Sequence, residues 1–191
     1  RRAAERRGGT PTSVTVILLD GLNTRFQDPA SAKAQLVKFL GQLQPHDRLA
    51  ICALGNGLRV LHDFTNNTAS LLRSLARFSG RNSSELEASN PEEPNTGDEE
   101  LDQFLREANQ RMTDFYTIRR VERTLEAVEG IANHLTRLPG RKNLIWVSGG
   151  FPLTLGLDAE ATDPARGKRT FSREMERAAR AVNNANLAIY P

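Results

Sequence analysis

Residues 14–20 read Val-Thr-Val-Ile-Leu-Leu-Asp, a nearly unbroken apolar run that ends in a carboxylate. A strand with one face in water alternates apolar and polar residues, whereas a strand covered on both faces is apolar almost throughout. The run therefore predicts a central strand of an α/β sheet, with helices packed on both faces of that sheet.

Strands and helices alternate along the rest of the chain. Gly-Asn-Gly at 55–57 joins two short apolar runs and favours a hairpin, because these residues tolerate positive φ. The elements expected from period and punctuation are a helix over about 28–44, strands over 48–54 and 58–64, a helix over 68–78, a strand over 143–148, a helix over 171–183 and a strand from 187. This order predicts a Rossmann-like three-layer αβα sandwich, with a mostly parallel sheet and one antiparallel hairpin strand.

The middle of the chain predicts an acidic loop followed by two helices. Residues 79–98 are rich in Ser, Asn, Glu, Pro and Gly, as in a loop or a disordered insert, and residues 81–103 hold eight acids and one base. A short helix is expected over 99–112, and the longest amphipathic helix over 118–138. In the short helix we expect four apolar side chains to face inward: Leu101, Phe104, Leu105 and Ala108.

Length and composition indicate one domain. The 191 residues are 38% hydrophobic and carry a net charge of +3, and the single cysteine, Cys52, lies in an apolar run and is expected to be a core thiol. We expect a basic linker over 1–11 and a domain over 12–191 that lacks its last helix and strand. No apolar run reaches the roughly 20 residues of a membrane helix, so no membrane insertion is expected. Aromatic residues do not alternate with basic ones, so no nucleic-acid partner is expected.

Polar and small residues follow two of the predicted buried strands. Asp20, Asn23 and Thr24 come at and after the end of the first strand, and Ser148 and Gly149 come at the end of a later one. In an open α/β sheet, ligands bind beyond the carboxyl ends of the strands. These residues, with Thr117 just before the long helix, are therefore the candidate binding site.

Two motifs carry a family resemblance. Residues 19–24 read Leu-Asp-x-x-Asn-Thr, and residues 140–152 read Gly-Arg-Lys-Asn-Leu-Ile-Trp-Val-Ser-Gly-Gly-Phe-Pro. With the order of elements over residues 12–191, they resemble the von Willebrand factor A (vWA) domain, and more closely a bacterial "VWFA-related" variant. The resemblance implies a non-enzymatic module that binds a protein partner, in an exported or envelope-associated bacterial protein.

The resemblance also implies a metal site for Mg²⁺ or a similar ion, built from an Asp-x-Ser-x-Ser motif, a Thr and a second Asp. Asp20, Thr24 and Thr117 match the first Asp, the last hydroxyl and the Thr. Leu22, however, stands where a Ser is expected, and Gly149 where the second Asp is expected. Because the number of charged ligands sets affinity in such sites, we expect weak or absent binding of Mg²⁺.

Four interpretations of the candidate site remain open at this point. The loops at 20–28, 114–119 and 148–153 could bind a protein partner, or Asp20, Asn23 and Thr24 could simply hydrogen-bond their own loop. A small-molecule or nucleotide-binding enzyme would need several titratable groups at the strand ends, where the sequence offers Asp20 and little else. A structural domain that packs against the rest of its own chain is the fourth interpretation.

Overall fold

β1 (Ser13–Asp20) lies in the middle of the sheet, with β2 and β4 paired to it in parallel on either side. The computed structural model describes residues 13–24, 29–41, 47–78, 83–89, 91–150 and 171–191. Its five strands have the order β3-β2-β1-β4-β5, and only the β2–β3 pair is antiparallel. The other strands are β2 (Arg48–Leu54), β3 (Leu58–Thr65), β4 (Arg141–Val147) and β5 (Leu187–Tyr190). The predicted fold class is confirmed.

Successive residues of β1 pack into two different cores, as the pleat of a strand requires. Val16 and Leu18 belong to the cluster beneath two helices, α4 (Glu99–Leu135) and α6 (Ser172–Ala185). Ile17 and Leu19 belong to the cluster beneath α1 (Pro29–Leu40) and α2 (Thr68–Arg77). All residues of β1 after the first are buried. The unbroken apolar run is thus explained by helices on both faces.

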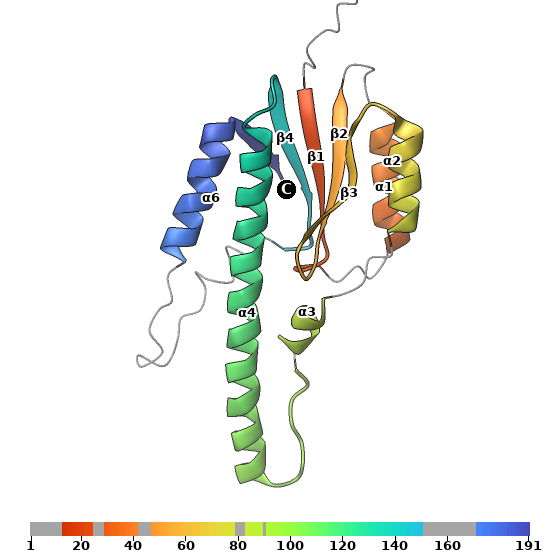
Figure 1. Cartoon of the computed structure of the whole chain (residues 1–191). Coiled ribbons are helices and arrows are strands. Elements are labelled where there is room, and N and C mark those ends of the chain that lie inside the picture. The colour runs from red at the N-terminus through yellow and green to blue at the C-terminus, as the bar shows by residue number, and fades with distance from the viewer. Residues whose placement is uncertain (1–12, 25–28, 42–46, 79–82, 90, 151–170) are drawn as a thin grey trace, which may run out of the picture.

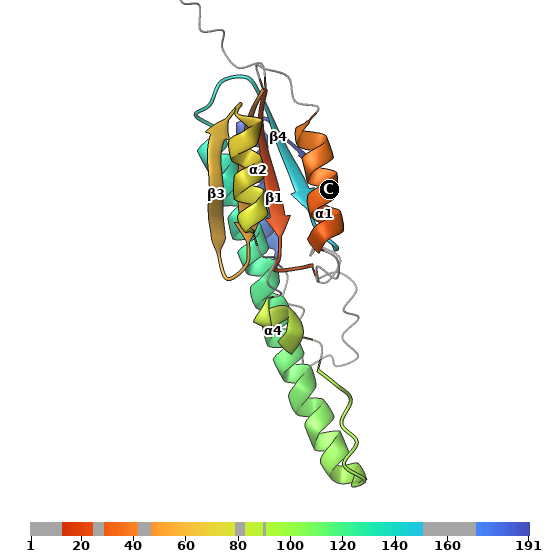
Figure 2. The same cartoon turned by 90° about the vertical axis from the view of Figure 1, so that its right-hand side faces the viewer.

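The helices form the two outer layers of the sandwich (Figure 1). α1 (Pro29–Leu40) and α2 (Thr68–Arg77) cover one face, and α4 (Glu99–Leu135) and α6 (Ser172–Ala185) cover the other, as the turned view also shows (Figure 2). No helix in the described parts of the chain is long and apolar enough to cross a membrane.

The prediction of two helices over 99–112 and 118–138 is wrong, because α4 is one helix of 37 residues. Residues 113–117 read Thr-Asp-Phe-Tyr-Thr, which are weak helix formers but include neither Gly nor Pro, the residues that break helices. At its start the Asp98 side chain accepts hydrogen bonds from the backbone N–H groups of Glu100 and Leu101. At 1.5 Å per residue, α4 is about 55 Å long.

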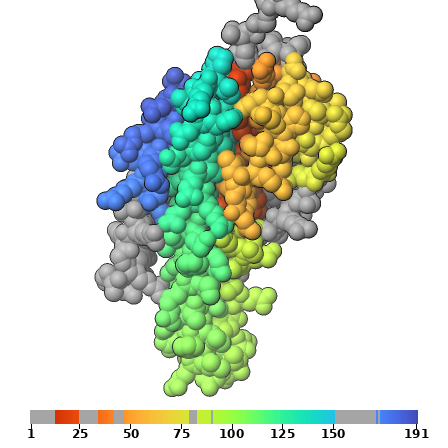
Figure 3. All heavy atoms as spheres, in the orientation of Figure 1, coloured from red at the N-terminus to blue at the C-terminus, as the bar shows by residue number. Residues whose placement is uncertain are grey.

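The first half of α4 projects beyond the sheet and stands clear of the body (Figures 1 and 3). Leu101 is 45% exposed and Phe104 is 61% exposed, so the prediction that they face inward is wrong. This stretch is helical, as its spacing predicts, but the sheet ends before it can cover this part of the helix.

The prediction of a loop over 79–98 is wrong for α3 (Ser84–Ala88). The hydroxyl of Ser83 caps this helix by accepting from the backbone N–H of Glu85 at 3.2 Å. Glu85 is buried and pairs with Arg123 of α4 at 2.8 Å. Composition placed this acid in solvent, because its basic partner lies 38 residues further along the chain. Residues 91–98 have no regular element, as expected, whereas 79–82 and 90 lie outside the described residues.

Candidate functional site

Asp20 ends β1, and its side chain is completely buried. Its Oδ1 accepts hydrogen bonds from the backbone N–H groups of Leu22 at 3.1 Å and Asn23 at 3.0 Å. The loop after β1 therefore folds back over the carboxylate, in the manner of an Asx turn. This part of the site is local in sequence, as one of the open interpretations expected.

Contacts from β4 and from the loop complete the surroundings of Asp20. Trp146 Nε1 donates to Oδ2 at 3.0 Å, and Ser148 Oγ lies 3.1 Å from the same oxygen. Asn23 Nδ2 lies within 3.2 Å of both oxygens. Oδ1 thus has three donor contacts and Oδ2 has two, besides the Ser148 hydroxyl, whose single hydrogen also faces the Gly150 carbonyl at 2.6 Å. An ionised carboxylate has about four lone-pair sites in all. Groups of the protein itself fill the acceptor capacity of Asp20.

Arg120 of α4 brings a buried positive charge next to this carboxylate, through Asn23. Its Nε and Nη2 donate to Asn23 Oδ1 at 3.3 and 3.2 Å, and its Nη1 donates to Ser89 Oγ at 2.9 Å. Burial lowers the pKa of Arg120, and the charges of Asp20 and Glu85 oppose that shift. A guanidinium nevertheless stays protonated in proteins. Asp20, Asn23 and Arg120 therefore form one buried network that contains both signs of charge.

Thr124 fixes the other hydrogen of the Asn23 amide. Asn23 Nδ2 donates to Thr124 Oγ1 at 2.9 Å, and that hydroxyl donates to the carbonyl of Arg120 at 2.8 Å. The hydroxyl that α4 contributes to the site is thus that of Thr124. Thr117 lies seven residues earlier, about 10 Å along the helix toward its projecting end.

The accessible edge of the site is made by Thr24, Ser148 and Gly149. The backbone N–H of Gly149 donates to Thr24 Oγ1 at 2.7 Å, and the hydroxyls of Thr24 and Ser148 are 3.4 Å apart. Gly149 is exposed, whereas Thr24 and Ser148 are half-buried. The structure therefore brings together five of the six residues picked from the sequence, in two layers: Asp20 and Asn23 beneath, and these three above.

Comparisons with known proteins concern the fold only. No protein-family model and no curated protein matches the sequence. One similar solved structure is a conserved hypothetical protein BatB from Bacteroides thetaiotaomicron, with 11% identity, 70% of this chain and 52% of that chain covered, and a TM-score of 0.40. This chain therefore spans about half of that protein.

Two further solved structures are similar over nearly the whole chain. An aerotolerance-related membrane protein from Bacteroides fragilis, with multiple mutations to serines, shares 11% identity over 95% of this chain and 90% of its own, with a TM-score of 0.41. The SpRpn10 VWA domain shares 10% identity over 94% of this chain and 87% of its own, with a TM-score of 0.38. Over most of its length the chain resembles a vWA domain. Similarity at this level says nothing about what the chain binds.

The described residues of this site do not fit a divalent ion. The oxygens of Asp20 are already filled, and Leu22, in place of a ligand hydroxyl, is fully buried in the core. A Cβ on Gly149 would lie 3.2 Å from Thr24 Cγ2, so the position of the second carboxylate is also tight. Among the residues that the structure describes, no cluster of three or more His, Cys, Asp or Glu could hold a metal.

Other residues weighed from the sequence lie away from this site. Burial, with a smaller effect of the Asp63 charge, raises the pKa of the Cys52 thiol to about 11, as suits a core residue. His62 is on β3, and the ring of His134 stacks on Phe64 with centroids 6.2 Å apart. His46 and the basic linker lie outside the described residues.

Sequence reasoning missed Arg120, Thr124 and Trp146. The first two lie four residues apart on the buried face of α4, and an arginine in an otherwise apolar helix face was the signal available. Trp146 was part of the second motif but was read only as a strand residue. Its indole N–H needed a buried partner, which a sequence cannot name.

Proposed function

We propose that the chain is a non-enzymatic protein-interaction module that binds its partner at the carboxyl edge of the sheet. The supporting observation is the two-layer site: a buried charged network holds the loop after β1, and Thr24, Ser148 and Gly149 lie above it at the surface. Because Asp20 is completely buried, it acts as a positioning residue and does not touch the partner.

Metal independence is the second part of the proposal. In the vWA-like metal site, a divalent ion would balance two carboxylates and keep a coordination position open for an acidic group of the partner. Here one carboxylate remains, and the guanidinium of Arg120 lies on the far side of Asn23. Among the described residues, the surface above offers hydroxyl and backbone groups without net charge. We therefore expect a partner that forms hydrogen bonds there, and no dependence on Mg²⁺.

The location proposed for the protein follows from its motifs. They resemble those of exported or envelope-associated bacterial proteins, and we propose the same location for this chain. Extracts of the cell envelope are therefore the first place to look for the partner.

The test compares capture of envelope proteins by the wild-type chain and by a Thr24→Ala/Ser148→Ala variant. Both changes are small and leave Trp146 and Asn23 in contact with Asp20, so the fold should persist, as circular dichroism would show. A matched control is Glu176→Ala/Arg180→Ala, which removes an exposed i,i+4 pair on α6. We expect one partner that the control retains, that the Thr24/Ser148 variant loses, and that EDTA does not release. If the Thr24/Ser148 variant keeps every captured protein, the proposed surface is wrong.

A further inference from the structure

The projecting half of α4 carries an exposed apolar stripe. Its members share one side of the helix and are Leu101, Phe104, Ala108, Met112 and Phe115. The exposed fractions of its large side chains are 45% for Leu101, 61% for Phe104, 51% for Met112 and 50% for Phe115. At 100° per residue, the five positions fall within an arc of about 80°. The stripe lies on the opposite side of α4 from the residues that enter the core between 120 and 135.

The spacing of the stripe is symmetric about Ala108. Leu101 and Phe115 each lie seven residues from Ala108, and Phe104 and Met112 each lie four residues from it. A twofold axis that is perpendicular to the helix and passes between two copies at the level of Ala108 would therefore place the two stripes face to face in an antiparallel pair. Leu101 would then face Phe115 of a second copy, and Phe104 would face Met112 of that copy. The small side chain at the centre lets the two backbones approach closely.

Charges beside the stripe are complementary in the antiparallel pair. Glu107 and Arg111 are both exposed, and with the axis at Ala108 Arg111 lies level with residue 105 of the second copy. Each Arg111 would therefore come within about 3 Å, measured along the helix, of Glu107 of the second copy. The first turn of α4 is acidic, and in the antiparallel pair it would lie next to Arg119 of the second copy. In a parallel pair the two acidic turns would face each other. Charge therefore favours the antiparallel arrangement.

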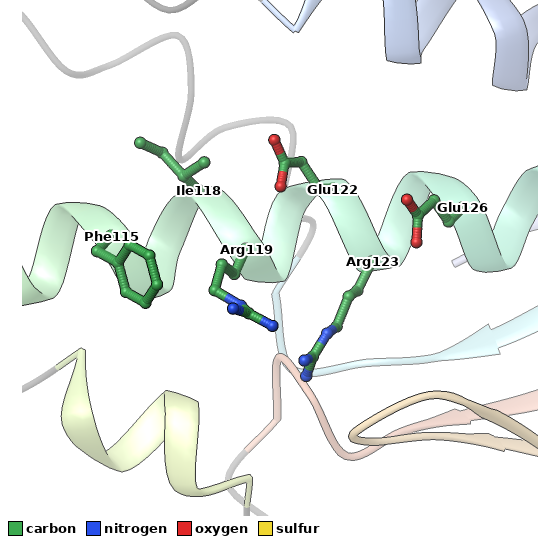
Figure 4. A pocket seen from close by; sticks show the side chains of 6 residues that line it. All are labelled: Phe115, Ile118, Arg119, Glu122, Arg123 and Glu126. Carbon is green, nitrogen blue, oxygen red and sulfur yellow. The ribbon is translucent and has the colours of Figure 1, made fainter.

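The surface beyond Phe115 leaves room for the end of the second helix. A hollow of about 400 Å³ continues on the same side of α4 and is lined by Phe115, Ile118, Arg119, Glu122, Arg123 and Glu126 (Figure 4). Arg119 lies over the ring of Phe115, with its guanidinium carbon 5.5 Å from the ring centroid. The acidic tip of the second α4 would reach the near end of this hollow.

We propose that two copies of this chain associate through the projecting halves of α4, packed antiparallel about Ala108. The stripe is about 21 Å long, and the surface it can bury is smaller than the about 800 Å² per partner of standard interfaces. The dimer is therefore a reversible one, with a dissociation constant in the micromolar range. It leaves the carboxyl edge of the sheet in each copy to another partner.

Sedimentation equilibrium from low micromolar to several hundred micromolar tests the association. We expect a monomer–dimer equilibrium, and at least a tenfold weaker one in Phe104→Glu and in Met112→Glu. Gln103→Glu adds the same charge next to Phe104 but off the stripe, and should change the dissociation constant less than twofold. A chain that stays monomeric at the highest concentration, or a dimer insensitive to both stripe variants, overturns the proposal.

Disulfide cross-linking tests the direction of the pair. Ala108→Cys lies on the proposed axis and should link to itself, whereas two copies of Leu101→Cys would be about 21 Å apart and should not. Mixed Leu101→Cys and Phe115→Cys chains should link to each other, because a disulfide needs Cα atoms within about 7 Å. The native Cys52 is buried and serves as the unreactive background. Self-linking of Leu101→Cys would show a parallel pair and overturn the proposal.

Discussion

Replacing Arg120 with methionine should destabilise the fold substantially, although the side chain lies on a helix and its replacement is a good helix former. The change removes two hydrogen bonds to Asn23 Oδ1 and one to Ser89 Oγ. Asn23 is itself buried, so its oxygen is left without a donor. Asp20 also loses the nearest buried positive charge.

The magnitude follows from these losses. A buried acceptor left without its donor costs about 1–3 kcal/mol, and removing one charge of a buried pair costs about 3–5 kcal/mol. Asp20 and Arg120 are linked through Asn23 and are not in direct contact, and Asp20 keeps its own donors. We therefore expect a loss near the lower end, about 3 kcal/mol. For a domain of this size each kcal/mol lowers Tm by about 2–4 °C, so Tm should fall by about 6–12 °C.

Urea unfolding followed by circular dichroism measures this loss directly. Arg120→Lys keeps the charge but loses the forked donors, and should recover only part of the stability. The matched control is Arg106→Met, an exposed position of the same helix, where the change should stay within about 0.5 kcal/mol. If Arg120→Met is as stable as this control, the guanidinium does not hold the loop after β1 in place.

Three further predictions concern the same site and the core. Asp20→Asn puts an amide donor against groups that themselves donate, such as the Trp146 N–H, and should cost about 2–4 kcal/mol in urea unfolding; an unchanged midpoint would show that those contacts are not formed. Calorimetric titration with Mg²⁺, Mn²⁺ or Ca²⁺ should give no dissociation constant below about 1 mM, because the oxygens of Asp20 are filled; a tighter value would contradict this. The raised pKa of Cys52 stabilises the fold fully below its ordinary value of 9.0, and that contribution is lost as the pH rises through about 11. Alkaline unfolding of Cys52→Ala should lack this loss, and an identical pH dependence in both chains would refute the assignment.

The sheet could be predicted from the sequence because its signals are local. The apolar run of β1, the Gly-Asn-Gly turn and the alternation of elements each depend on neighbouring residues, and all three predictions are confirmed. The loop contacts of Asp20 with residues 22 and 23 belong to the same class. They need only the turn chemistry of the residues directly after the strand.

The deeper layer of the site could not be predicted, because its partners are far apart in the chain. Arg120 lies 97 residues from Asn23, and Thr124 lies 101 residues from it. Which α4 hydroxyl reaches the loop depends on the position of the helix along its axis and on its rotation relative to the sheet. The sequence of neither element determines these two quantities. Thr117 and Thr124 are two turns apart on similar faces of one helix, so the pattern alone could not choose between them.

The single carboxylate beneath the loop and the buried arginine have one electrostatic explanation. A site with two carboxylates would need a divalent ion for neutrality, whereas a site with Asp20 alone needs one positive charge. Arg120 supplies that charge from within the chain, at a fixed place and without an ion to bind or lose. A positive charge supplied by a side chain offers no open coordination position through which a partner's carboxylate would bind. In the proposed function, recognition is left to the hydroxyl and backbone groups of Thr24, Ser148 and Gly149, whose geometry we expect the buried network to hold whether or not metal is present.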